Sequence, residues 1–127
     1  MKILKVVLIG AGNRGETYTN IMHEFPEKFQ VVAVAEPVLS RRNHVKTLHN
    51  IPDDLCFDSY SELFKKGKIA DLAIISTQDR MHFAPAMEAI KLKYDLLLEK
   101  PLAPSAEECL SIMRAAQEND VRSDCFR

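Results

Sequence analysis

The 127-residue sequence lacks the features that mark membrane, nucleic-acid-binding and secreted proteins. None of its apolar stretches approaches the ~20 residues that span a bilayer, which excludes a membrane-spanning helix. Its net charge is only −1, so it lacks the positive field that attracts nucleic acid or an anionic membrane surface. Its three cysteines, Cys56, Cys109 and Cys125, have neither the paired spacing of a zinc site nor the even number of a disulfide framework. We therefore expect a cytoplasmic protein with reduced thiols that binds neither membranes nor nucleic acid.

The composition is otherwise that of an ordinary globular domain. Hydrophobic residues make up 46% of the chain and charged residues 28%, and the length is near the commonest size of a single domain. The opening residues, MKILKVVLIGAG, carry the lysines of a signal peptide, but the apolar run is too short and leads into glycines instead of a cleavage site. We expect one folded domain.

Short β-rich apolar runs alternate with segments whose apolar residues have helical spacing. This alternation predicts a doubly wound α/β fold with a parallel sheet. Continuous apolar runs are expected for strands that helices cover on both faces. The expected strands are 6–9, 31–35, 72–75 and 96–98.

The expected helices carry capping signals and apolar stripes. Two S-x-x-E boxes, over 59–62 and 105–108, each predict a helix start. Asn50 predicts the end of a helix over 40–49, in which Val45 and Leu48 point inward. The other residues expected to point inward are Tyr18, Ile21, Met22 and Phe25 before the helix breaker Pro26, then Phe83, Ala86, Met87 and Ile90, and then Ala106, Cys109, Leu110 and Met113.

A glycine motif, G-x-G-x-x-G, lies between the first expected strand and the first expected helix. Gly10 permits a tight turn, Gly12 leaves room for a diphosphate against bare backbone, and Gly15 lets the helix pack closely on the strand. The amino end of the helix supplies unpaired N–H donors to the phosphates. Asn13 and Arg14 lie between the glycines and are candidates for further contacts to the diphosphate. The motif predicts a dinucleotide site, with a purely structural loop or another nucleoside ligand as alternatives.

An acidic residue is expected at the end of the second strand of such a site, where it accepts hydrogen bonds from the adenosine ribose. Glu36 closes the run VVAVAE at that position. A carboxylate there favours NAD because it repels the 2′-phosphate of NADP. Arg41 and Arg42 follow closely on a segment expected to face solvent or a ligand, so NADP remains an alternative cofactor.

A second set of polar residues follows two later strands. Ser76 and Thr77 begin the segment STQDRMH, which ends in His82 after the strand over 72–75. Glu99, Lys100 and Pro101 follow the strand over 96–98. Both segments fall at the carboxyl edge of the predicted sheet, where doubly wound folds bind ligands.

Together, GAGNRG, the acidic end of the second strand, Thr-x-x-x-x-His and EKP resemble the Gfo/Idh/MocA family of NAD(P)-dependent oxidoreductases, which includes glucose-fructose oxidoreductase and inositol dehydrogenase. The resemblance extends from Leu4 to about Asn119. It implies that the Lys100 ammonium lies beside the nicotinamide, orients a substrate hydroxyl and stabilises a developing alkoxide. It also implies a cofactor-side role for Glu99, whose side chain alternates with that of Lys100.

The resemblance implies further residues on the cofactor side and also has departures. Ser76, Thr77, His82 and Pro101 complete the expected cofactor site. The family often has Thr-Pro-Asn in the loop where this sequence has Gln78 and Asp79, which puts the asparagine contact in question. The other histidines, at 23, 44 and 49, lack ligand partners at suitable spacing and are expected to be surface or packing residues, so we predict no metal site.

The residues after the last expected helix suit a buried strand poorly. Val121 could begin a strand, but Arg122, Ser123 and Asp124 are unfavourable in a buried parallel strand. We therefore expect the sheet to stop one strand early. The exposed edge would be able to pair with a second copy, which makes a homo-oligomer an expected assembly.

The resemblance implies a second, larger α/β domain that binds a sugar or polyol and supplies a histidine acid or base. We expect a cofactor domain over 1–120 and a short atypical tail over 121–127, truncated before that substrate domain. Hydride transfer by this chain alone is therefore not expected. A non-catalytic nucleotide-binding or interaction module is the main alternative. An S-adenosylmethionine-dependent methyltransferase is a weaker one, because it leaves EKP unexplained.

Overall fold

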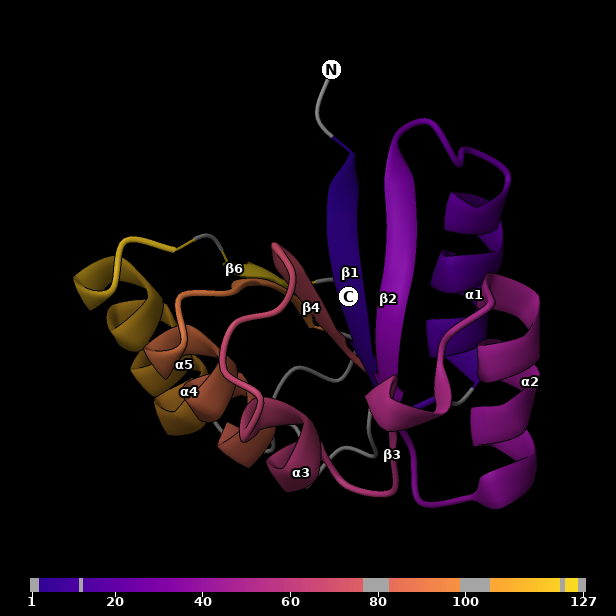
Figure 1. Cartoon of the computed structure of the whole chain (residues 1–127). Coiled ribbons are helices and arrows are strands. Elements are labelled where there is room, and N and C mark those ends of the chain that lie inside the picture. Colours follow the sequence, from indigo (N-terminus) through magenta and orange to yellow (C-terminus); the bar gives the residue numbers. More distant parts are fainter. Residues whose placement is uncertain (1–2, 12, 77–82, 99–105, 122, 126–127) are drawn as a thin grey trace.

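The computed structural model describes residues 3–11, 13–76, 83–98, 106–121 and 123–125. They form one six-stranded sheet with helices on both faces (Figure 1). Every neighbouring pair of strands is parallel, and the order is β3-β2-β1-β4-β5-β6. This is the doubly wound order, so the predicted fold class is confirmed. The strands are β1 (Leu4–Ile9), β2 (Phe29–Ala35), β3 (Cys56–Phe57), β4 (Leu72–Ile75), β5 (Asp95–Leu98) and β6 (Ser123–Cys125).

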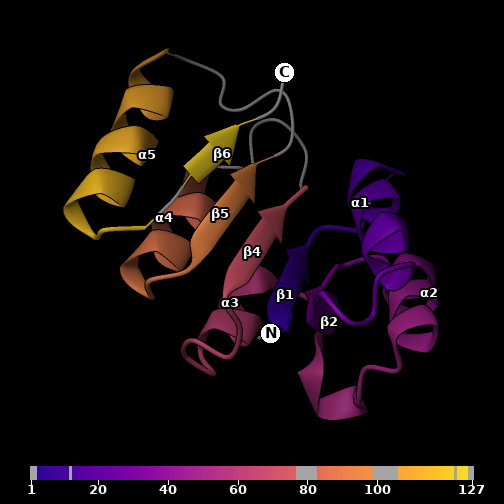
Figure 2. The same ribbon diagram turned by 90° about the horizontal axis from the view of Figure 1, so that it is seen from above.

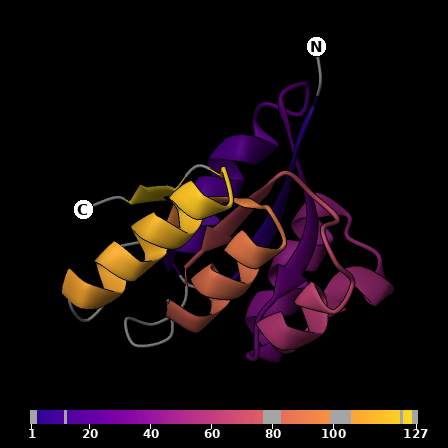
Figure 3. The same cartoon turned by 90° about the vertical axis from the view of Figure 1, so that its left-hand side faces the viewer.

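The helices divide between the two faces of the sheet, as the view from above shows (Figure 2). The first two cover one face, and the other three cover the opposite face, which is turned toward the viewer in Figure 3. None of the helices in the described part of the chain has the length and apolar character needed to cross a bilayer. The helices are α1 (Asn13–His23), α2 (Leu39–His49), α3 (Tyr60–Phe64), α4 (Phe83–Lys91) and α5 (Ala106–Glu118), with a 3-10 turn over Asp53–Leu55.

Side chains of β1 alternate between two apolar cores, one on each face. Val7 and Ile9 belong to the core under α3, α4 and α5, whereas Val6 and Leu8 belong to the core that contains Val45 of α2. All four β1 side chains are at most 1% exposed. This two-sided burial explains why the strand appears in the sequence as a continuous apolar run rather than an alternating one.

The prediction that the sheet stops one strand early is wrong. Residues Ser123–Cys125 form β6, which pairs in parallel with β5. Strand β6 is at the edge and has a partner on one side only, so its backbone hydrogen bonds form without the apolar residues that a central strand requires. The two-residue strand β3, at the other edge, was not predicted because it is too short for a periodic signal.

Two of the predicted apolar stripes are partly wrong. Ile21 is 51% exposed and Phe25, which lies beyond the end of α1, is 41% exposed, whereas Thr19 is buried. On α5, Met113 is 58% exposed while its neighbour Ile112 is fully buried. Apolar residues at adjacent helix positions allow two stripes with the same period, and only contact with the sheet selects one of them.

Other helix predictions are confirmed. Val45, Ala86 and Ile90 are buried. Asn50 has the left-handed conformation expected of a helix end, with φ of 54°. Ser59 accepts a hydrogen bond from the backbone N–H of Glu62 at 3.4 Å, although the Glu62 carboxylate pairs with Lys65 instead of completing the box. The box over 105–108 and the side chains of Tyr18, Phe83, Ala106, Cys109 and Leu110 lie outside the described residues.

Candidate cofactor site

The candidate site lies at the carboxyl edge of the sheet, where the strand order reverses around β1. Strand β1 pairs with β2 on one side and with β4 on the other, and their last residues, Ile9, Ala35 and Ile75, are in register. Helices α1 and α2 therefore leave the sheet on one face and α4 on the other. A crevice at this reversal is the usual ligand site of doubly wound sheets.

The backbone at the end of β1 forms the turn that the glycine motif predicts. Gly10 has φ of 87°, a conformation that residues with a Cβ rarely adopt. Its N–H donates to the Ala35 carbonyl at 2.8 Å, and the N–H of Ser76 donates to the Ile9 carbonyl at 2.8 Å. These bonds hold Gly10 and Ser76 beside the ends of β2 and β1, respectively. Helix α1 begins shortly afterwards, at Asn13.

Glu36 joins the end of β2 to this turn. Its Oε1 accepts a hydrogen bond from the N–H of Ala11 at 2.7 Å, and its Oε2 accepts one from the N–H of Val38 at 2.8 Å. The residue is only 4% exposed. Two N–H donors to a carboxylate offset much of the cost of burying its charge. The predicted ribose-binding carboxylate is therefore held against the turn that is predicted to bind the diphosphate.

Arg42 reaches back to the same residue. Its Nη1 donates to the Glu36 carbonyl oxygen at 2.7 Å. Arg42 is half-buried, whereas Arg41 is exposed. The sequence placed both arginines toward solvent or a ligand, but the structure shows that the two have different surroundings.

The remaining predicted site residues are not described. Gly12, Thr77, His82, Glu99, Lys100 and Pro101 lie outside the described residues, as do Gln78, Asp79 and the side chains of Asn13 and Arg14. Gly15 lies within α1. The roles assigned to all these residues stay predictions. Strand β5, which precedes EKP, ends in register with β4, because Leu98 pairs with Ile75.

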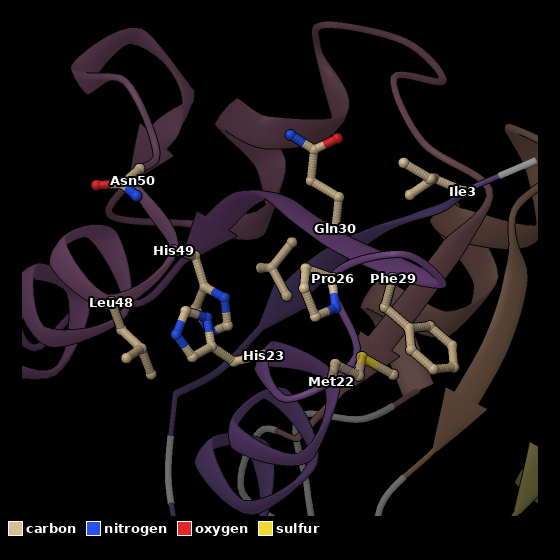
Figure 4. Close-up of a pocket in the computed structure, with 10 residues that line it drawn as sticks. Ile3, Met22, His23, Pro26, Phe29, Gln30, Leu48, His49 and Asn50 are labelled. Atoms are coloured by element: carbon tan, nitrogen blue, oxygen red, sulfur yellow. The ribbon is translucent and has the colours of Figure 1, made fainter.

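A separate cavity of about 320 Å³ lies at the opposite edge of the sheet (Figure 4). It is lined by the start of β2, including Phe29 and Gln30, and by the carboxyl ends of α1 and α2. The imidazoles of His23 and His49 point toward each other there from the two helices, with ring centroids 5.4 Å apart in an edge-to-face arrangement. Sequence analysis did not detect this pair, because 26 residues separate the two positions.

His49 is the more buried of the two histidines. Its burial, reinforced by the nearby His23 and His44 imidazoles, lowers its pKa to about 4. Its Nε2 is buried and has no hydrogen-bond partner among the described residues. The exposed His23 and His44 and the packed His49 agree with their predicted surface and packing roles. In the described part of the chain, no three His, Cys, Asp or Glu side chains are grouped so as to hold a metal ion.

The sequence and the fold were compared with those of known proteins. Residues 4–125 match the family described as an oxidoreductase family with an NAD-binding Rossmann fold. Inositol 2-dehydrogenase of Pseudarthrobacter chlorophenolicus is 30% identical over 112 residues, which are 88% of this chain and 32% of that protein. The scyllo-inositol 2-dehydrogenase (NADP(+)) IolW of Bacillus subtilis is 26% identical over 118 residues, which are 93% of this chain and 31% of that protein.

A solved structure gives the corresponding result for the fold. The WlbA dehydrogenase of Bordetella pertussis, in complex with NADH and UDP-GlcNAcA, has a TM-score of 0.88 at 18% identity over 98% of this chain and 37% of that chain. The chain spans about a third of the length of the curated relatives. The family match favours an oxidoreductase over the methyltransferase alternative. With nearly all of its residues matched, the chain belongs to this family of oxidoreductases with an NAD-binding Rossmann fold.

Proposed function

We propose that this chain is the dinucleotide-binding part of an oxidoreductase that transfers hydride between NAD and the hydroxyl or ketone carbon of a sugar or cyclitol. The observation that carries the proposal is the bond between the Glu36 carboxylate and the Ala11 N–H. This contact brings a ribose-binding group and a phosphate-binding turn together at the reversal of the strand order. The family match supports the same conclusion.

The described residues fit a dinucleotide in three respects. Gly10 turns the chain at the end of β1 and leads into α1, whose amino end offers N–H donors for the diphosphate. The Glu36 oxygens each have a second lone pair with which to accept a ribose hydroxyl. Val38 and Leu39, 43% and 58% exposed beside Glu36, offer an apolar surface for an adenine ring.

NAD supplies the hydride acceptor when it is bound. We infer that Lys100 then orients the substrate hydroxyl and stabilises the alkoxide that forms as hydride leaves the carbon. This role is supported by the family match and by the position of EKP directly after β5. Thr77, His82, Glu99 and Pro101 are proposed to contact the cofactor.

The substrate and the assembly belong to the proposal too. Because the curated relatives are about three times as long, we infer a cofactor domain over 1–120 that works with a separate substrate domain. The inositol dehydrogenases among the relatives support a cyclitol or sugar as the substrate. Self-association through the β6 edge and a cytoplasmic setting are further inferences, the latter supported by the free thiol of Cys56.

Titration of the purified chain with NADH, followed by nicotinamide fluorescence, tests the proposed binding. We expect saturable binding that weakens about tenfold in Glu36→Gln, the size of one lost charge-assisted hydrogen bond. The matched control is Glu62→Gln, since Glu62 lies on the exposed surface of α3. A folded chain without saturable binding at millimolar NADH would contradict the proposal.

Turnover with a panel of polyols and sugars separates the catalytic proposal from a non-catalytic binding module. Any turnover is expected to disappear in Lys100→Met while NADH affinity changes little. Turnover that persists without the Lys100 ammonium would show that another group performs its role.

A further inference from the structure

We propose that the adenosine end of this cofactor site also accepts a 2′-phosphorylated dinucleotide, with Arg42 as the positive partner of the phosphate. This inference rests on the proposed dinucleotide binding and deepens it. A carboxylate at the end of the second strand normally indicates NAD, because its charge opposes a 2′-phosphate. The contacts around Glu36 weaken that opposition in two ways.

First, the Glu36 carboxylate is directed into the protein. Its oxygens accept the N–H groups of Ala11 and Val38 at 2.7 and 2.8 Å, and the residue is only 4% exposed. The positive ends of two N–H dipoles therefore lie against the negative charge. A ligand at the surface meets a carboxylate that is already partly compensated.

Second, a guanidinium is fixed to the same residue. Arg42 Nη1 lies 2.7 Å from the Glu36 carbonyl oxygen, so opposite charges are carried on and beside one residue. A guanidinium has five N–H donors in a planar fork, and the bond to the carbonyl uses one of them. The others are suited to the oxygens of a phosphate, which arginine binds through two parallel hydrogen bonds.

The surroundings of Arg42 add no negative charge from its own helix. The first turn of α2 contains no acidic residue. The backbone N–H of Arg42 donates to the Val38 carbonyl at 3.0 Å, so the arginine lies one helical turn after the segment that leaves Glu36. Arg41 is exposed and adds a second positive charge close by. The local balance of charge therefore favours an anion.

The test compares the dissociation constants of NADH and NADPH for the same folded chain by fluorescence titration. We expect the unmodified chain to bind both, with affinities within about tenfold of each other, because Arg42 offsets the repulsion by Glu36. In Arg42→Gln we expect NADPH to lose about tenfold more affinity than NADH, which corresponds to one charge-assisted contact. Arg42→Lys should recover part of the loss, because it restores the charge without the fork.

The matched control is Arg41→Gln, which removes the same charge from the neighbouring exposed position. It should change the ratio of the two constants by no more than about threefold, as expected of an exposed charge. Saturable NADH binding without NADPH binding would overturn this inference alone, as would equal losses for both ligands in Arg42→Gln. A selective NADPH loss in Arg41→Gln would overturn the assignment to Arg42. A folded chain that binds neither ligand would overturn the proposed function first and this inference with it.

Discussion

The carboxylate of Glu36 and the backbone N–H of Ala11 are hydrogen-bonded at 2.7 Å, although 25 residues separate them in the sequence. This bond ties the end of β2 to the glycine turn after β1. A second bond, from the N–H of Val38, ties the same carboxylate to the segment that enters α2. Glu36 therefore braces two loops of the candidate site as well as offering a group for the ribose.

Glu36→Gln should lower the stability of the chain as well as its NADH affinity. The amide of glutamine has one acceptor oxygen, so one of two buried backbone N–H groups would face an NH2 donor. Leaving such a donor without a partner costs about 1 to 3 kcal/mol. Urea unfolding followed by circular dichroism measures the loss, and an unchanged midpoint would show that the two bonds do not brace the loops.

Gly10→Ala should lower both stability and NADH affinity. Gly10 has φ of 87°, and a left-handed conformation costs a residue with a Cβ about 1 to 2 kcal/mol. The matched control is Gly67→Ala, because Gly67 has φ of 78° and an added Cβ would meet no atom within 4 Å. Both variants should unfold at lower urea, but only Gly10→Ala should weaken NADH binding. Equal NADH affinities would contradict the role assigned to the turn.

Tyr94→Phe should destabilise the core without affecting cofactor binding. Tyr94 is fully buried, and its hydroxyl accepts the Ile69 N–H at 3.0 Å and donates to the Gly67 carbonyl at 3.3 Å. Removing the hydroxyl leaves these groups without that partner and should cost about 1 to 2 kcal/mol. Tyr60→Phe is the control, since the Tyr60 ring also contacts Phe64 but is less buried. Thermal unfolding compares the two, and equal shifts would contradict the prediction.

The chain should lose stability on mild acidification because of His49. Its pKa is about 4 in the folded chain and near 6.5 when unfolded, so the unfolded chain takes up the proton first. This contribution is complete above pH 6.5 and is lost as the pH falls to about 4. Allowing for the partial exposure of His49, we expect a loss of about 1 to 2 kcal/mol.

The difference between the unmodified chain and His49→Phe isolates this effect, because carboxylate titration is common to both. Urea unfolding between pH 6.5 and 4 should show a flatter dependence for His49→Phe. His44→Gln, at an exposed position of α2, should keep nearly the full slope. Identical slopes for the unmodified chain and His49→Phe would contradict the prediction.

Local signals in the sequence were sufficient for much of the fold and part of the site. The apolar runs predicted β1, β2, β4 and β5, because a strand buried on both faces leaves few polar residues. The glycine motif predicted the turn at Gly10, and its spacing from Glu36 predicted the carboxylate at the end of β2. The inward positions of Ile21 and Met113 were wrong, since periodicity alone cannot select one of two adjacent stripes.

Sequence by itself determined the order of strands and helices, the left-handed turn at Gly10 and the acidic end of β2, because each depends on residues that are neighbours along the chain. Only the tertiary structure decided that Glu36 binds Ala11, that Arg42 reaches the Glu36 carbonyl, that His23 faces His49 and that β6 completes the sheet. These contacts depend on which strands lie side by side and how far a flexible side chain reaches. Neither property leaves a periodic or local signal, because both arise only when distant segments pack together.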